Sequence, residues 1–98
     1  MNINKQTNGT EITFTLEGRL DTTTAPALEA ELNGVLANAT GLKLDLAKLE
    51  YMSSAGLRVL LSAQKAMSKK GQLTIANVSA EIMEIFELTG FSDILTIV

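Results

Sequence analysis

Two adjacent serines, Ser53 and Ser54, have the residue type and position best suited to chemistry in this sequence. Ala55-Gly56 and then apolar residues at helical spacing follow them, so we expect the pair at the start of a helix. A serine there caps free backbone N–H groups, which contributes about 1 kcal/mol. Its hydroxyl could also accept a phosphoryl group, because the positive end of the helix dipole favours a phosphate dianion. The spacing alone leaves both roles open.

A nucleophilic serine is the catalytic alternative, and it requires a general base. The chain has no His to supply one. Lys65 lies about three helical turns beyond Ser54, roughly 16 Å at a rise of ~1.5 Å per residue. A Ser–Lys pair is the one arrangement left open, and we expect no enzymatic activity.

The composition excludes several further classes of function. The chain has no Cys or His, and its Asp residues at positions 21, 45 and 93 are isolated, so we expect neither a metal site nor a cofactor. A net charge of −3 with scattered basic residues does not favour direct nucleic-acid binding. No apolar run approaches the ~20 residues of a membrane span, and the first five residues do not resemble a signal peptide. We therefore expect a cytoplasmic protein.

The 98 residues, 46% of them hydrophobic and 19% charged, suit one globular domain over residues 1–98. Alternating apolar residues, turn residues and helical stripes predict eight elements in the order β-β-α-β-α-β-α-β. The first half holds a hairpin turning at Asn8-Gly9, a helix from near Thr24 to Asn38, and a strand at 42–46 leading to 49–52. A helix then runs from the serines to a left-handed exit at Gly71, followed by a strand at 72–77. The chain closes with a helix capped by Ser79 and ended by Gly90, and with a last buried strand at 94–98.

This order predicts a mixed α/β sheet with an antiparallel N-terminal hairpin, parallel strands beyond it, and helices mainly on one face. Functional residues of such sheets gather at the carboxyl ends of the parallel strands. Two segments should meet there, residues 18–24 after the second strand and residues 51–56 after the third.

The stretch from Leu46 to Leu61, with Ser53-Ser54-Ala55-Gly56-Leu57 at its centre, resembles the signature of the STAS domain, named for sulfate transporters and anti-sigma factor antagonists. The likeness extends to residues 18–21, to Lys70-Gly71 and to residues 88–91. Ser53 stands where many members have Asp, and Ala55 where they have a second hydroxyl residue. The chain is thus identified as similar to the stand-alone anti-sigma factor antagonists.

The resemblance implies a partner switch. The unphosphorylated protein would bind an anti-sigma factor that is also a serine kinase, phosphorylation of Ser54 would prevent binding, and a serine phosphatase would restore it. Ser53 is a secondary acceptor, and we expect a monomer when the protein is free. The contact set expected for the partner is Asp21, Thr22, Ser53, Gly56, Leu57 and Arg58.

A second role stays open beside the switch. Some relatives are constitutive scaffolds, either in stress-signalling complexes or as accessory subunits of lipid-transport ATPases. In such a protein the serine at the helix start would be a docking residue only.

Overall fold

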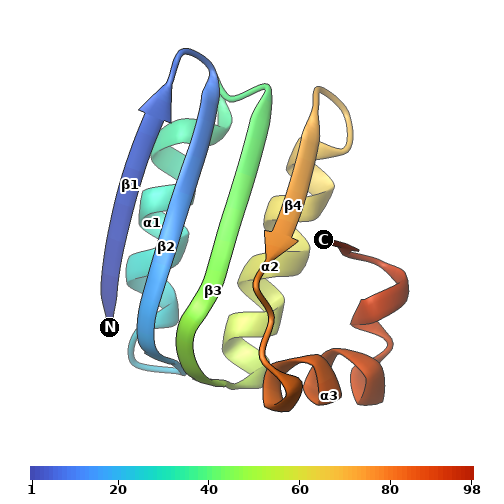
Figure 1. Ribbon diagram of the computed structural model, residues 1–98. Coiled ribbons are helices and arrows are strands. Elements are labelled where there is room, and N and C mark those ends of the chain that lie inside the picture. Colours follow the sequence, from blue (N-terminus) through green and yellow to red (C-terminus); the bar gives the residue numbers. More distant parts are fainter.

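The computed structural model describes residues 1–98, and its five strands form one sheet in the order β1-β2-β3-β4-β5 (Figure 1). β1 pairs antiparallel with β2, and every other pairing is parallel. The predicted mixed sheet and element order are confirmed. The elements are β1 Asn2–Asn8, β2 Glu11–Leu20, α1 Ala25–Leu36, β3 Gly41–Met52, α2 Ser54–Met67, β4 Gln72–Ala76, α3 Ala80–Thr89, the 3-10 helix η1 Phe91–Asp93 and β5 Thr96–Ile97.

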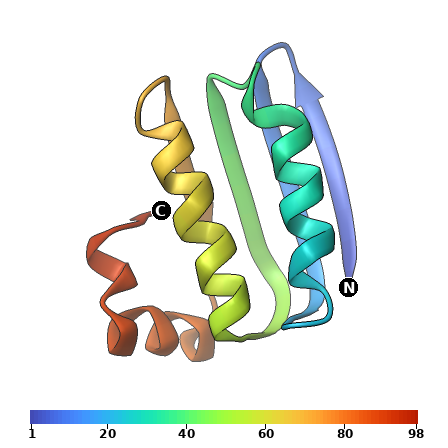
Figure 2. The same cartoon turned by 180° about the vertical axis from the view of Figure 1, so that it is seen from behind.

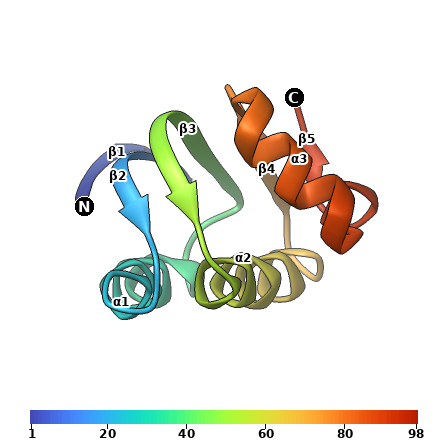
Figure 3. The same ribbon diagram turned by 90° about the horizontal axis from the view of Figure 1, so that it is seen from below.

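Two helices, α1 and α2, lie side by side against one face of the sheet (Figures 2 and 3). Alternate residues of β2 and of β3 belong to the hydrophobic core and are almost wholly buried. They are Ile12, Phe14 and Leu16 on β2, and Leu42, Leu44 and Leu46 on β3. α3 lies outside the two-helix layer, at the end of β4 and against β3 (Figures 1 and 3). The helices are therefore mainly on one face, as predicted.

A carboxylate on β3 fixes the connection that leads into α3. Oδ1 of Asp45 accepts hydrogen bonds from the backbone N–H of Ala47, at 3.0 Å, and from Nδ2 of Asn77, at 3.1 Å. These bonds, that of Ala47 first, hold the pKa of Asp45 below its usual value. Asn77 has a left-handed backbone with φ of 56°, and Ser79 then caps α3 by accepting from the N–H of Ile82 at 3.3 Å.

The hairpin turn and the last strand differ from their predicted positions. The hairpin turn lies one residue later than expected, because Asn8 pairs with Glu11 and Gly9 alone takes a positive φ, of 65°. The last strand is only two residues long. Only Thr96 and Ile97 pair with β4. Leu95 is buried, but Ile94 and Val98 are 46% and 69% exposed, so the prediction of a buried strand over 94–98 is wrong for most of its length.

The expected left-handed exit at Gly71 is wrong, since the glycines with positive φ are at positions 9, 18 and 90. Gly71 is required for a different reason. A Cβ at this position would overlap the backbone carbonyl of Thr40, against which the chain passes as it enters β4. Gln72 donates to the same carbonyl oxygen at 3.4 Å. Close backbone approach, and not helix termination, demands glycine here.

Gly71→Ala should lower the free energy of unfolding by about 1–3 kcal/mol, because a backbone carbonyl must move to admit the methyl group. Gly34→Ala is the matched control. Gly34 lies inside α1 with open space at its Cβ position, so alanine should stabilise the protein by about 0.5–1 kcal/mol. Urea unfolding of both variants measures the difference, and equal effects would contradict this packing account.

Candidate functional site

The two segments that were predicted to converge do meet at the carboxyl ends of β2 and β3. Leu20 and Met52 are partners in the parallel register, and both are buried. The backbone N–H of Ser53 donates to the carbonyl of Leu20 at 2.9 Å. This bond joins the start of α2 to the end of β2.

Gly56 allows α2 to begin so close to the sheet. A Cβ at Gly56 would lie 2.7 Å from Cγ of Leu20 and 3.1 Å from Cγ of Met52. Leu57 beside it is only 7% exposed and belongs to the core. The geometry gives both residues a packing role in the free protein, and their contact with a partner stays a prediction.

The two serines lie in different environments. Ser53 is the N-cap residue of α2, but its side chain makes no capping hydrogen bond, and its Oγ is buried without a partner. The expected side-chain cap is therefore not made. Ser54 is exposed and is the first residue of α2. The first N–H groups of a helix have no intrahelical acceptor, so Ser54 sits beside free donors at the positive end of the helix dipole.

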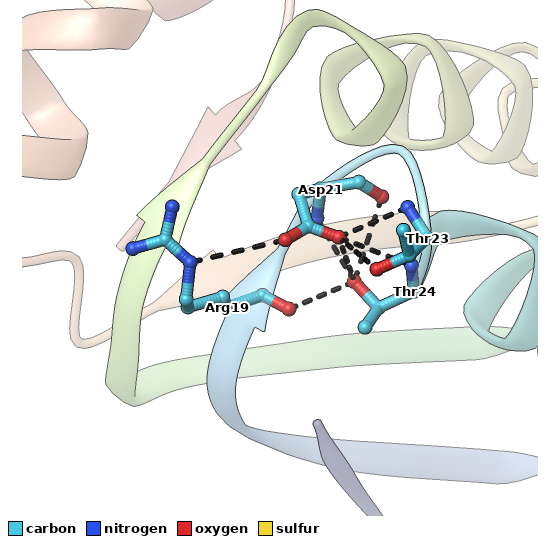
Figure 4. A network of polar contacts seen from close by, with 4 residues as sticks. All are labelled: Arg19, Asp21, Thr23 and Thr24. Atoms are coloured by element: carbon cyan, nitrogen blue, oxygen red, sulfur yellow. Dashed lines mark hydrogen bonds and ion pairs between the residues drawn. The ribbon is translucent and has the colours of Figure 1, made fainter.

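Asp21 organises the neighbouring loop (Figure 4). Its Oδ1 accepts from the hydroxyl of Thr23 at 2.7 Å and from the backbone N–H groups of Thr23 and Thr24 at 3.0 and 3.2 Å. These bonds, with the Thr23 hydroxyl contributing most, hold the pKa of Asp21 below its usual value. The carboxylate thus stays ionised and fixes the loop between β2 and α1.

Thr24 is the N-cap of α1, but its hydroxyl does not cap the helix. Instead, its Oγ1 accepts from the N–H of Asp21 at 2.9 Å and donates to the carbonyl of Arg19 at 2.8 Å. The backbone carbonyl of Asp21 accepts from the N–H of Ala25 at 2.8 Å. Asp21, and not the Thr24 side chain, therefore accepts from the free backbone N–H groups at the start of α1.

Arg19 and Tyr51 are two site residues whose contact was not predicted from the sequence. They are opposite each other in the β2–β3 register, and the Arg19 guanidinium carbon lies 4.3 Å from the centre of the Tyr51 ring. Nε of Arg19 is 3.8 Å from Oδ2 of Asp21. Both residues fall within the two segments noted from the sequence. Their pairing depends on register shifts between β2 and β3, which residue patterns do not reveal.

The remaining predicted contacts, Thr22 and Arg58, are both exposed. Arg58 follows Ser54 by four residues on α2, so the two side chains share one face of the helix. No cluster of three or more acidic side chains could hold a metal ion. No helix in the structure has the length and apolar character needed to cross a membrane.

The family model described as "Mlab, STAS domain" matches residues 3–97. The chain belongs to the STAS domain family. It is 30% identical over 98 residues to the anti-sigma-B factor antagonist of Bacillus subtilis, covering 99% of this chain and 90% of that protein. It is 31% identical over 95 residues to the anti-sigma-B factor antagonist of Listeria monocytogenes, covering 95% of this chain and 83% of that one.

Solved structures share the fold. An anti-sigma factor antagonist from Mycobacterium paratuberculosis superposes with a TM-score of 0.89 at 23% identity, over 98% of this chain and 83% of that one. The anti-sigma factor antagonist SpoIIAA in its unphosphorylated form gives a TM-score of 0.79 at 15% identity, over 99% and 87%. The phosphorylated form of SpoIIAA from Bacillus gives 0.78 at 16% identity, over 99% and 91%.

Asp21→Asn should make stability less sensitive to acid. Because the folded-state pKa of Asp21 is lowered, its stabilising contribution is complete above the unfolded-state pKa and is lost as the pH falls through the folded-state value. Wild type should therefore lose more stability than the variant between pH 7 and about pH 3. The effect should be small because the loop is exposed. Urea midpoints at both pH values measure it, and identical acid losses would contradict the assigned role of the carboxylate.

Proposed function

We propose that this protein is an anti-sigma factor antagonist that works by partner switching. The unphosphorylated chain binds an anti-sigma factor and so releases a sigma factor. The anti-sigma factor is a serine kinase that phosphorylates Ser54, which ends the complex, and a serine phosphatase reverses the modification. The chain is thus a binding partner and a substrate, not a catalyst. Two relatives named anti-sigma-B factor antagonists, matched over nearly the full chain, support this role.

The observation that carries the proposal is the difference in access between the two serines. Ser54 presents an exposed hydroxyl on the first residue of α2, whereas Oγ of Ser53 is buried. A kinase must reach the hydroxyl that it modifies, so this difference supports Ser54 as the acceptor over Ser53. A phosphate on Ser54 would also project to solvent without displacing core residues.

The physical basis of the switch is charge. A phosphate adds about −1.5 to −2 charge at pH 7, and the free N–H groups of α2 stabilise it within the free protein. Arg58, four residues further on, is a second group able to pair with it. A partner docked over Ser54 would have to bury this charge or oppose it with its own, and both costs weaken the complex. The free fold is retained while the binding surface changes.

Ser54→Asp should weaken binding to the anti-sigma factor by at least about 100-fold, since it places a permanent charge at the helix start. It should shift the melting temperature by no more than about 5 °C, because Ser54 is exposed and the helix dipole tolerates an anion there. Ser54→Ala should bind normally and accept no phosphate. Isothermal titration and intact mass after incubation with Mg-ATP and the kinase measure these outcomes.

Ser53→Ala is the matched control for these variants. It removes a buried hydroxyl that makes no hydrogen bond, so stability and phosphorylation of Ser54 should be kept. Binding should also be kept, because the buried Oγ is not available to a partner even though Ser53 is in the predicted contact set. Full binding by Ser54→Asp would refute the switch and favour a constitutive scaffold, and phosphate on Ser53 would move the acceptor by one residue.

A further inference from the structure

The residue types most favoured in binding hot spots lie near one end of the sheet, where β2 and β3 end and α2 begins. It contains one Tyr, no Trp and two Arg, with Lys supplying its other basic residues. Tyr51 and Arg19 face each other at the carboxyl ends of β2 and β3, and Arg58 shares a helix face with Ser54. Tyr and Arg are enriched among the residues that dominate protein–protein binding energy. Arg19 and Tyr51 lie in the two segments that converge around the start of α2, and Arg58 lies in the second turn of that helix.

The Arg19–Tyr51 pair is held in place and is open to solvent. The cation lies over the ring at 4.3 Å, and Nε faces Oδ2 of Asp21 at 3.8 Å. Asp21 is itself fixed by Thr23 and Thr24, so the guanidinium rests on a braced loop (Figure 4). Yet the Arg19 side chain is 61% exposed and Tyr51 is 39% exposed. An ordered side chain loses less conformational entropy when a partner binds.

Arg19 keeps unused donors. Its interaction with Asp21 is made through Nε, and its two terminal nitrogens point away from that carboxylate (Figure 4). Neither terminal nitrogen has a hydrogen-bond or ion-pair partner within the chain. The two N–H groups form a fork that matches the two oxygens of a carboxylate. The exposed part of the Tyr51 ring beside it supplies an apolar contact.

We propose that Arg19 and Tyr51 anchor the anti-sigma factor, with Arg19 binding a carboxylate of that partner and Tyr51 packing on an apolar group next to it. This inference rests on the proposed function. It also explains the direction of the switch. A partner surface that presents a carboxylate to this end of the sheet is repelled when Ser54 acquires a phosphate, whereas a basic partner surface would be attracted.

The test is isothermal titration of the anti-sigma factor kinase of the source organism with the full chain and its variants, without ATP. Arg19→Ala and Tyr51→Ala should each weaken binding at least tenfold, while Tyr51→Phe keeps the ring and binds nearly as wild type does. Lys5→Ala on β1 removes the same charge from an exposed position of the outer strand and should bind as wild type does. Melting curves confirm that each variant is folded.

The salt dependence of binding shows whether Arg19→Ala loses a charge contact with the partner or only the packing of its side chain. Binding by wild type and Lys5→Ala should weaken between 50 and about 300 mM NaCl, and Arg19→Ala should lose part of that dependence. Arg19→Lys keeps the charge without the fork and should bind with intermediate affinity.

Should Arg19→Ala and Tyr51→Ala bind as wild type does while Ser54→Asp fails to bind, the anchor is refuted and the switch stands. Should wild type fail to bind, or Ser54→Asp bind equally well, the proposed function falls and the anchor with it.

Discussion

The close packing of Gly56 against Leu20 and Met52 is the constraint on which the rest of the site depends. With no side chain at Gly56, α2 begins directly against the ends of β2 and β3, and the N–H of Ser53 reaches the carbonyl of Leu20. Any larger residue would push the helix start away from the sheet. That contact sets the depth of the two serines, and so determines which hydroxyl is buried and which is exposed.

The loop after β2 completes the surface around that helix start. Asp21, held by Thr23 and Thr24, fixes the loop, and Arg19, near the end of β2, lies over the ring of Tyr51. The surface thus combines the exposed hydroxyl of Ser54, the Arg19 cation beside Asp21 and the partly exposed ring of Tyr51, on a protein of net negative charge. A single phosphate changes the charge of this surface while the core beneath it, made largely of leucine, is left untouched.

The order of the elements could be predicted from the sequence because its local signals agree with one another. Alternation in β2 and β3, the Ser79 cap and the end of α3 at Gly90 each appear where the pattern predicted. Features set by contacts distant in sequence were missed. The need for Gly71 arises from the backbone of Thr40, the burial of Ser53 Oγ from the neighbouring strand ends, and the Arg19–Tyr51 pair from register shifts in β2 and β3. The periodicity of apolar residues along the chain does not indicate such contacts.

The proposed partner switch requires that Ser54, the exposed serine at the start of α2, is the residue that is phosphorylated. Peptide mapping by mass spectrometry, after the full chain is incubated with Mg-ATP and the anti-sigma factor kinase of its source organism, tests it most directly. We expect one added phosphate, on Ser54, and loss of the complex in proportion to its occupancy. A complex that persists at full Ser54 occupancy, or a chain that takes up no phosphate, would contradict the account.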